Sequence, residues 1–245
     1  TPNVAAKKPS ALTIIDGIDV PSAIDMELEQ RGKEKCAYRA YLDLNRRIEY
    51  LYSSNALDNM QSRKASEEDK NIAIKYKEAK KALIESVCDI ILCSVDKYEC
   101  VDGQFGLWHK AKCEEIMGTM NTAVFQDDSL ILKSNSFTYG LAQKWVNMTL
   151  KYLWLLDKLP EGLTEKSLHV PIDSFILEKL QEENVDEIKR DGDTYKYIGK
   201  SWSQLDDYDV YLDIQTKIGQ IAGKTFPIEW EGSAWMDIAK KRSNE

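Results

Sequence analysis

Histidine and closely paired cysteines are scarce in this chain of 245 residues, which contains only His109 and His169. Two histidines exclude a histidine-rich metal site. The five cysteines are an odd number and include no C-x-x-C pair, so a structural zinc or iron–sulfur site lacks its usual close ligand pairs. We therefore expect free thiols in a reducing compartment, and neither a metal nor a cofactor. The cysteines are Cys36, Cys88, Cys93, Cys100 and Cys113.

Long hydrophobic runs are absent as well. No apolar stretch approaches the roughly 20 residues that span a bilayer. The first ten residues, TPNVAAKKPS, lack the apolar core of a signal peptide. These absences predict a protein without a membrane partner, and the cytoplasm is its expected location.

Internal repeats and low-complexity linkers are also missing from the sequence. A chain of this length can form one large domain around its own core. We expect a flexible N-terminal lead over residues 1–20, followed by a single helical domain over residues 21–245.

Basic residues are fewer than acidic ones, so the formal net charge is −8 and the isoelectric point is about 5.1. This balance counts against indiscriminate binding of polyanions. A local basic strip can still bind phosphate while the acidic residues cover another face.

What the sequence does contain is helical periodicity along most of its length. A capping-box pattern, Ser66-Glu67-Glu68-Asp69, opens a long helix that reaches Val95. Residues 53–66 are interpreted as a connection, and a turn at residues 191–192 predicts a small β-hairpin near residues 188–200. The fold class is therefore all-α. The helices form one body or two lobes, and the N-terminal and C-terminal halves of the chain meet at a central helix. The other expected helices cover residues 33–54, 105–120, 140–156, 174–184, 203–221 and a last helix from residue 227.

The central helix is expected over residues 140–156, because two apolar stripes run along opposite sides of it. One side between the stripes carries a narrow polar strip of Lys144, Asn147, Lys151 and Lys158. Unpaired charge is costly to bury, so this strip should face a cleft or a partner.

A second segment follows, with the sequence His169-Val170-Pro171-Ile172-Asp173. Proline favours an extended conformation for the residue before it. Asp173 occupies the N-cap position of the next helix, where free backbone N–H groups and the helix dipole stabilise a carboxylate. We therefore expect Asp173 to stay ionised.

These two segments together resemble the helix-hairpin-helix DNA glycosylases of the endonuclease III superfamily, over roughly residues 136–184. That family's hairpin reads approximately L-P-G-V-G-R-K-T-A-N-x-x-L-x-Y, and its next helix begins with a V-D-T element. In this chain the matching positions are Gly140, Lys144, Asn147, Leu150, Tyr152 and the run from Val170 to Asp173.

The resemblance implies a DNA base-excision glycosylase with abasic-site lyase activity, an all-α glycosylase-like fold and DNA as partner. By position, Lys144 matches the nucleophilic lysine and Asp173 the catalytic aspartate. Cleavage of an N-glycosidic bond builds positive charge on the sugar, which a fixed carboxylate stabilises. A neutral amine at Lys144 would attack the sugar to form a Schiff base.

The resemblance also assigns DNA contacts. The start of the central helix, at Gly140 and Ala142, would hold a phosphate together with Lys151. An extruded base needs an aromatic pocket, for which Tyr139, Trp202 and Trp230 are the candidates. The sequence departs from the family at the hairpin, where the proline and second glycine are missing. It also has no cysteine after Cys113, so the C-terminal iron–sulfur cluster of many relatives is excluded.

Two other functions stay open at this point. The first is a non-catalytic helical DNA-binding or protein-interaction domain that keeps the hairpin scaffold. The second is a hydrolase or transferase that uses Asp173 and other acids around a metal, although nothing in their spacing favours it. Those other acids are Asp206, Asp207, Glu229 and Glu231.

Overall fold

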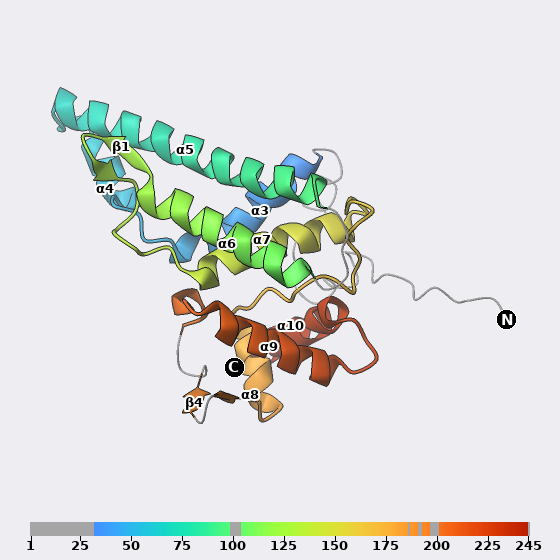
Figure 1. The fold of residues 1–245 in the computed structure, drawn as a ribbon. Coiled ribbons are helices and arrows are strands. Elements are labelled where there is room, and N and C mark those ends of the chain that lie inside the picture. The colour runs from blue at the N-terminus through green and yellow to red at the C-terminus, as the bar shows by residue number, and fades with distance from the viewer. Residues whose placement is uncertain (1–31, 99–103, 186, 191–192, 197–200, 245) are drawn as a thin grey trace.

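The computed structural model describes residues 32–98, 104–185, 187–190, 193–196 and 201–244. It is mainly helical, which confirms the all-α prediction (Figure 1). The predicted lead at residues 1–20 lies outside the described residues. The α-helices are α3 Lys33–Leu44, α4 Ser54–Met60, α5 Glu67–Asp96, α6 Phe105–Thr122, α7 Tyr139–Leu155, α8 Ser174–Glu182, α9 Tyr208–Ala222 and α10 Pro227–Ser243. The short 3-10 helices are η1 Asn45–Arg47 and η2 Trp202–Gln204.

The helices form two layers (Figure 1). In the N-terminal layer, α7 packs against α3 and α6, and α5 packs across the same two helices. In the C-terminal layer, α10 packs against α8 and α9. The irregular segment between α7 and α8 runs between the layers, so the chain passes through the interface on its way from one to the other.

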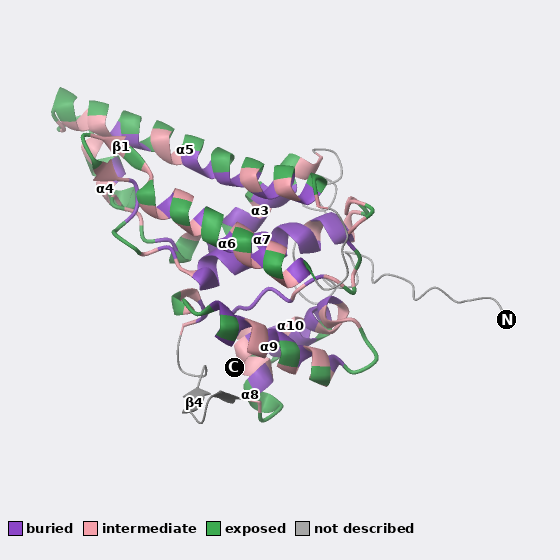
Figure 2. Ribbon diagram, viewed as in Figure 1, coloured by how far each residue is buried: buried purple, intermediate pink, exposed green. Residues whose placement is uncertain are grey.

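The central position of α7 is confirmed by its burial (Figure 2). Fifteen of its seventeen residues are buried, including the lysines of the polar strip that lie within the helix. Thr138 caps the start of the helix, and its side-chain oxygen accepts a hydrogen bond from the backbone N–H of Leu141. On the side facing α3, the indole of Trp145 is fully buried and donates to the carbonyl of Ala37 at 2.9 Å.

The longest helix, α5, begins where the sequence predicted. The Ser66 side chain accepts from the backbone N–H of Asp69, and the Asp69 carboxylate accepts from that of Ser66. This reciprocal pair satisfies two donors that a helix start leaves without a partner.

The prediction for residues 33–66 was wrong in two places. Helix α3 ends at Leu44, and α4 lies inside the expected connection. The cause is backbone pairing with a distant segment. The N–H of Leu51 donates to the carbonyl of Ile131, and the N–H of Lys133 donates to the carbonyl of Glu49. These contacts hold the residues after η1 in extended form, and no local sequence pattern predicts them.

Two short antiparallel hairpins complete the fold. The predicted hairpin is confirmed as β3 Glu187–Arg190 paired with β4 Asp193–Lys196, although its turn lies outside the described residues. The second hairpin was not predicted and joins β1 Val124–Gln126 to β2 Ser129–Leu130. Its turn uses Asp127 and Asp128, both with positive φ, a conformation that aspartate tolerates better than most residues.

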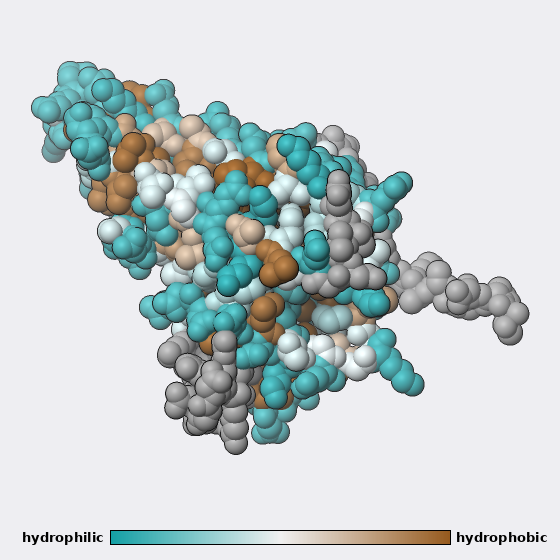
Figure 3. All heavy atoms as spheres, in the orientation of Figure 1, coloured by the Kyte–Doolittle hydropathy of each residue, from teal (hydrophilic) through white to brown (hydrophobic). Residues whose placement is uncertain are grey.

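The surface on the face drawn in Figure 3 is mostly hydrophilic, with hydrophobic side chains gathered near β1 and between α5 and α6. None of the described helices combines the length and the apolarity that crossing a membrane requires. Four of the five cysteines are free thiols, namely Cys36, Cys88, Cys93 and Cys113, and Cys100 lies outside the described residues.

Candidate functional site

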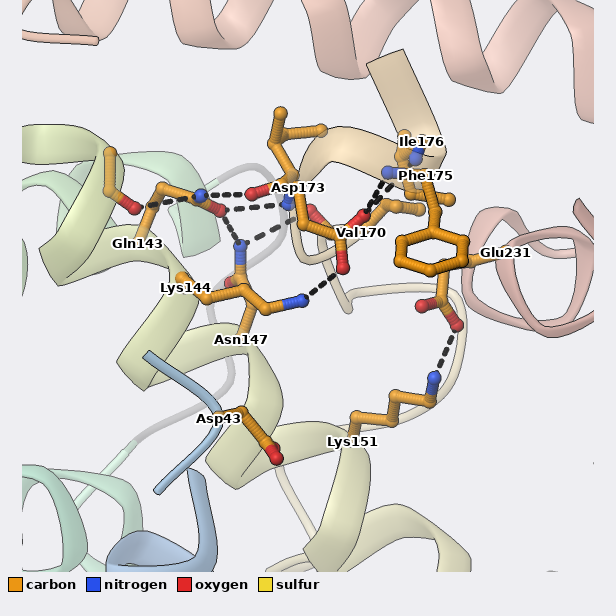
Figure 4. Close-up of polar contacts among 12 residues, drawn as sticks. Asp43, Gln143, Lys144, Asn147, Lys151, Val170, Asp173, Phe175, Ile176 and Glu231 are labelled. Carbon is orange, nitrogen blue, oxygen red and sulfur yellow. Dashed lines mark hydrogen bonds and ion pairs between the residues drawn. The ribbon is translucent and has the colours of Figure 1, made fainter. Parts of the chain in front are cut away.

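Lys144 and Asp173 meet, although 29 positions separate them in the sequence. The Nζ atom of Lys144, on α7, lies 2.6 Å from Oδ2 of Asp173 at the start of α8 (Figure 4). Only 5% of Lys144 and 8% of Asp173 is exposed to solvent. The two residues that the sequence singled out for chemistry therefore form a buried ion pair.

Asp173 uses its two carboxylate oxygens differently. Oδ1 accepts hydrogen bonds from the backbone N–H groups of Phe175 at 3.0 Å and Ile176 at 3.1 Å, which confirms the predicted N-cap of α8. Oδ2 receives the ammonium of Lys144. Three donors therefore converge on one carboxylate, two from the backbone of α8 and one from Lys144.

A second buried ion pair lies two helical turns further along α7. Nζ of Lys151 lies 2.5 Å from Oε2 of Glu231 on α10, and Glu231 is 1% exposed. The polar strip of α7 therefore faces the C-terminal layer, where acidic residues pair with both lysines. The sequence did not predict Glu231 as a partner, because 80 positions separate it from Lys151.

Two glutamines hold the segment that leads to Asp173. The side-chain amide of Gln143, on α7, donates to the carbonyl of Ile172 at 2.8 Å and accepts from its N–H at 3.1 Å. The amide of Gln215, on α9, makes the same two contacts with Val170, at 2.7 and 2.9 Å. Each glutamine pairs with both backbone groups of one residue, as a neighbouring strand does. The segment is thus fixed from both layers.

Asn147 connects this segment to an aromatic cluster. Its Nδ2 donates to the hydroxyl of Tyr211 at 2.8 Å, and that hydroxyl lies 2.9 Å from Nδ1 of His169. The ring of His109 stacks on Tyr211 with 5.2 Å between centroids. Burial lowers the pKa of His169 to about 3, and burial together with the nearby His169 lowers the pKa of His109 well below its usual value. Both histidines are therefore neutral at pH 7.

The buried polar side chains share one location. With the exception of Thr149, every buried polar or charged side chain in the described part of the chain lies between the two layers, and we call this set the polar seam. Its members are His109, Gln143, Lys144, Asn147, Lys151, Asp173, Gln215 and Glu231.

The predicted phosphate contacts are engaged inside the protein. The N–H of Gly140 donates to the carbonyl of Leu205 at 2.6 Å, and the N–H of Ala142 donates to that of Thr138 at 3.0 Å. Lys151 is held by Glu231. The role of Gly140, Ala142 and Lys151 in binding DNA stays a prediction, and phosphate could reach these donors only if the contacts opened.

Gly140 is a point of close approach between α7 and η2. A Cβ at this position would lie 2.0 Å from the carbonyl oxygen of Trp202, and backbone atoms cannot yield as a flexible side chain does. Only glycine lets η2 approach the start of α7 in this way. The glycine that matched the family hairpin thus has a packing reason to be there.

Two of the three candidates for a base pocket lie near the start of α7, and the third lies on α10. Tyr139 begins α7 and donates its hydroxyl to Glu114 at 2.7 Å, while Trp202 lies buried beside Gly140. Trp230 lies on α10, next to Glu231 in the sequence. Glu231 pairs with Lys151, which is 12 residues from Tyr139 along α7. At 1.5 Å per residue this is about 18 Å along the helix. The structure therefore does not bring the three rings together.

Three of the five acids proposed for a metal-dependent reaction have separate structural roles. Asp173 caps the start of α8, and Asp207 caps the start of α9 by accepting from the N–H groups of Asp209 and Val210. Glu231 pairs with Lys151. Within the described ranges, no group of three or more histidine, cysteine, aspartate or glutamate side chains is arranged to hold a metal ion.

The Lys144 and Asp173 contact supports one kind of chemistry directly. A proton can pass between Nζ and Oδ2 at 2.6 Å, because that separation is an ordinary hydrogen-bond length. The amine left by that transfer is a nucleophile, and the α8 N–H groups keep the carboxyl group in place.

Comparisons with known proteins do not identify a family for this chain. No family model, curated protein or solved structure matches the chain.

Proposed function

We propose that the protein is a DNA base-excision glycosylase with abasic-site lyase activity, in which Lys144 is the nucleophile and Asp173 the general base. The observation that supports this most is the 2.6 Å contact between Lys144 Nζ and Asp173 Oδ2. The contact supports the proposal because an amine and an acid chosen from sequence register alone lie within hydrogen-bonding distance of each other.

In the proposed reaction, Nζ of Lys144 attacks C1′ of the target nucleotide. The base departs with the electrons of the N-glycosidic bond and with the proton that Asp173 took from the Lys144 ammonium. The carboxylate that this restores stabilises positive charge on the sugar, and it accepts the second proton that the nitrogen loses as the Schiff base forms. The resulting Schiff base permits strand cleavage and can be trapped by borohydride.

The remaining sequence expectations belong to this proposal. DNA is the partner, the location is the cytoplasm, and the reaction needs no metal or cofactor. Tyr139, Trp202 and Trp230 stay candidates for stacking on an extruded base, one at a time rather than as a single pocket.

Borohydride trapping on DNA with an abasic site tests the proposal. We expect a covalent adduct with the unaltered chain, no adduct with Lys144→Ala, and a strongly reduced yield with Asp173→Asn. Lys241→Ala is the control, because it removes a lysine whose pair with Glu182 lies on the surface, and it should leave the adduct in place. No adduct with the unaltered chain, or an adduct that survives Lys144→Ala, would overturn the proposal.

A second candidate is a non-catalytic helical DNA-binding or protein-interaction domain. The pair of Lys151 and Glu231 favours it, since the fold buries a second lysine–carboxylate contact of similar geometry outside the residues that we propose for catalysis. Binding of DNA without an adduct would support this candidate. Failure to bind any DNA at low salt would count against DNA as a partner in both.

A further inference from the structure

A groove lies in the N-terminal layer, where α3 and α4 both pack against α5 (Figure 1). Its volume is about 580 Å³, which is within the range of small-molecule sites in proteins. None of the described residues that line the groove belongs to α7 or α8. The groove is therefore separate from the site of Lys144 and Asp173.

The groove offers apolar surface to a ligand. Its buried lining residues are Tyr41, Leu57 and Ile84, one from each of the three helices. Tyr38 and Leu42 also line it from one face of α3, and they are 47% and 41% exposed although both are large and hydrophobic. An apolar body bound here would remove the surface of these two side chains from water, which favours binding.

The charges that line the groove leave one positive charge in excess. Three lysines and two carboxylates line it, in a chain whose formal net charge is −8. This local excess favours a ligand with a single negative charge, and the two carboxylates oppose a second one. The lysines are Lys77, Lys80 and Lys81, and the carboxylates are Asp58 and Glu85.

Lys80 is the lysine that can receive this ligand. The other two have polar partners, namely Gln61 for Lys77 and Glu85 for Lys81. The Nζ atom of Lys80 instead lies 3.5 Å from the centre of the Tyr50 ring, and it forms no ion pair or hydrogen bond with any described residue. Burial of the Lys80 side chain lowers its pKa, and an anion beside it would again favour the charged form.

We propose that this groove binds a small organic acid, with the carboxylate on Lys80 and the apolar body against Tyr38 and Leu42. The proposal does not rest on the glycosylase function. A carboxylate forms charge-assisted hydrogen bonds with an ammonium, and these are stronger than the contact with the face of Tyr50. The three N–H donors of the ammonium allow the bound acid to add to that contact.

An NMR titration with 4-phenylbutyrate tests the site. We expect saturable shifts of the backbone amides of Leu42, Leu57 and Ile84, with a Kd below about 1 mM. The alcohol 4-phenylbutan-1-ol keeps the apolar body without the charge, so it should bind at least about fivefold more weakly. Equal affinities of the acid and the alcohol, or no saturable shift at these amides, would overturn the proposal.

Substitutions separate the contribution of the charge from that of the apolar surface. Lys80→Gln should weaken binding of the acid about tenfold and leave binding of the alcohol unchanged, whereas Lys80→Arg should keep both. Leu42→Ser should weaken both ligands, because it removes apolar surface from the groove. Its side chain is partly exposed, so the substitution should leave the fold intact.

Lys75→Gln is the matched control for the charge. Lys75 is exposed on the same helix and does not line the groove, and its substitution changes the net charge equally. It should alter the affinity for neither ligand. A loss in Lys75→Gln as large as that in Lys80→Gln would overturn the role of Lys80. Borohydride trapping does not involve the groove, so failure of either proposal leaves the other standing.

Discussion

The two buried ion pairs of α7 look alike but depend on their lysines to different degrees. Asp173 keeps two backbone donors from α8 when its lysine is removed. For Glu231, Lys151 is the hydrogen-bond and ion-pair partner, and no such helix start surrounds it. The Asp173 carboxylate is therefore held by backbone groups as well as by its lysine, whereas the Glu231 carboxylate is held by a cation.

This asymmetry suits the role that we propose for the pair of Lys144 and Asp173. A catalytic carboxylate must keep its position while its lysine changes protonation state and partner. Substitutions that affect one pair and not the other test the difference between them.

The largest effect should come from Lys151→Met, which leaves Glu231 buried without its cation. Removing one partner of a buried pair costs about 3–5 kcal/mol of unfolding free energy. Lys144→Met should cost less, about 1–2 kcal/mol, because Asp173 retains the α8 N–H groups. Urea unfolding of both variants measures the difference. Equal losses would mean that the α8 cap does not support Asp173 as the structure indicates.

Gly140→Ala tests the point where η2 meets α7. The added methyl group cannot fit against the Trp202 carbonyl, so the layers must shift, and we expect a loss of about 1–3 kcal/mol. Gly118→Ala on α6 is the control, because nothing lies within 4 Å of the place that its added methyl group would occupy. That variant should gain up to about 1 kcal/mol from helix propensity. A neutral Gly140→Ala would show that the contact is loose.

Acid should weaken the middle of the seam. The unfolded chain protonates histidine near pH 6.5, while burial keeps the folded pKa of His169 at about 3 and lowers that of His109. Stability is therefore complete above pH 6.5 and falls as the pH decreases toward the folded pKa. When the pH falls from 7 to 5.5, the two histidines together should lower the free energy of unfolding by about 2 kcal/mol. Denaturant unfolding of His169→Gln should show about half of this loss, and an unchanged slope would contradict the assignment.

The smallest effect should come from Asp207→Ala, which removes a helix cap without a buried lysine. Asp207 accepts from two backbone N–H groups of α9, as Asp173 does on α8. Loss of such a cap costs about 1 kcal/mol. Asp173→Ala should lower the free energy of unfolding by more than this in the same assay, because it also leaves Lys144 buried without its ion-pair partner. If the two aspartates cost the same, the ion pair adds nothing to the cap.

Local patterns in the sequence predicted the elements that local interactions determine. The capping box at Ser66, the N-cap at Asp173 and Pro227 at the start of α10 all mark helix starts where the structure has them. The lysine strip of α7 was visible from its spacing at Lys144 and Lys151. Its burial was not, because the paired acids lie on other helices.

The parts that failed or were missed depend on long-range contacts. The end of α3 at Leu44 follows from pairing with residues near Ile131. Gln143 and Gln215 carry no motif, and they matter only because the segment before Asp173 passes between them. Gln143 precedes Lys144 on a helix that the sequence predicted to be central. A glutamine expected to be buried beside a charged residue is a signal that could have been noticed.

Mapping the site of a borohydride-trapped adduct by mass spectrometry tests the central claim most directly. The protein, trapped on abasic-site DNA and digested, should yield one modified peptide, with the sugar remnant on the Nζ atom of Lys144. A remnant on Lys151 or on any other amine would contradict the claim that the lysine held by the helix-capping aspartate is the nucleophile.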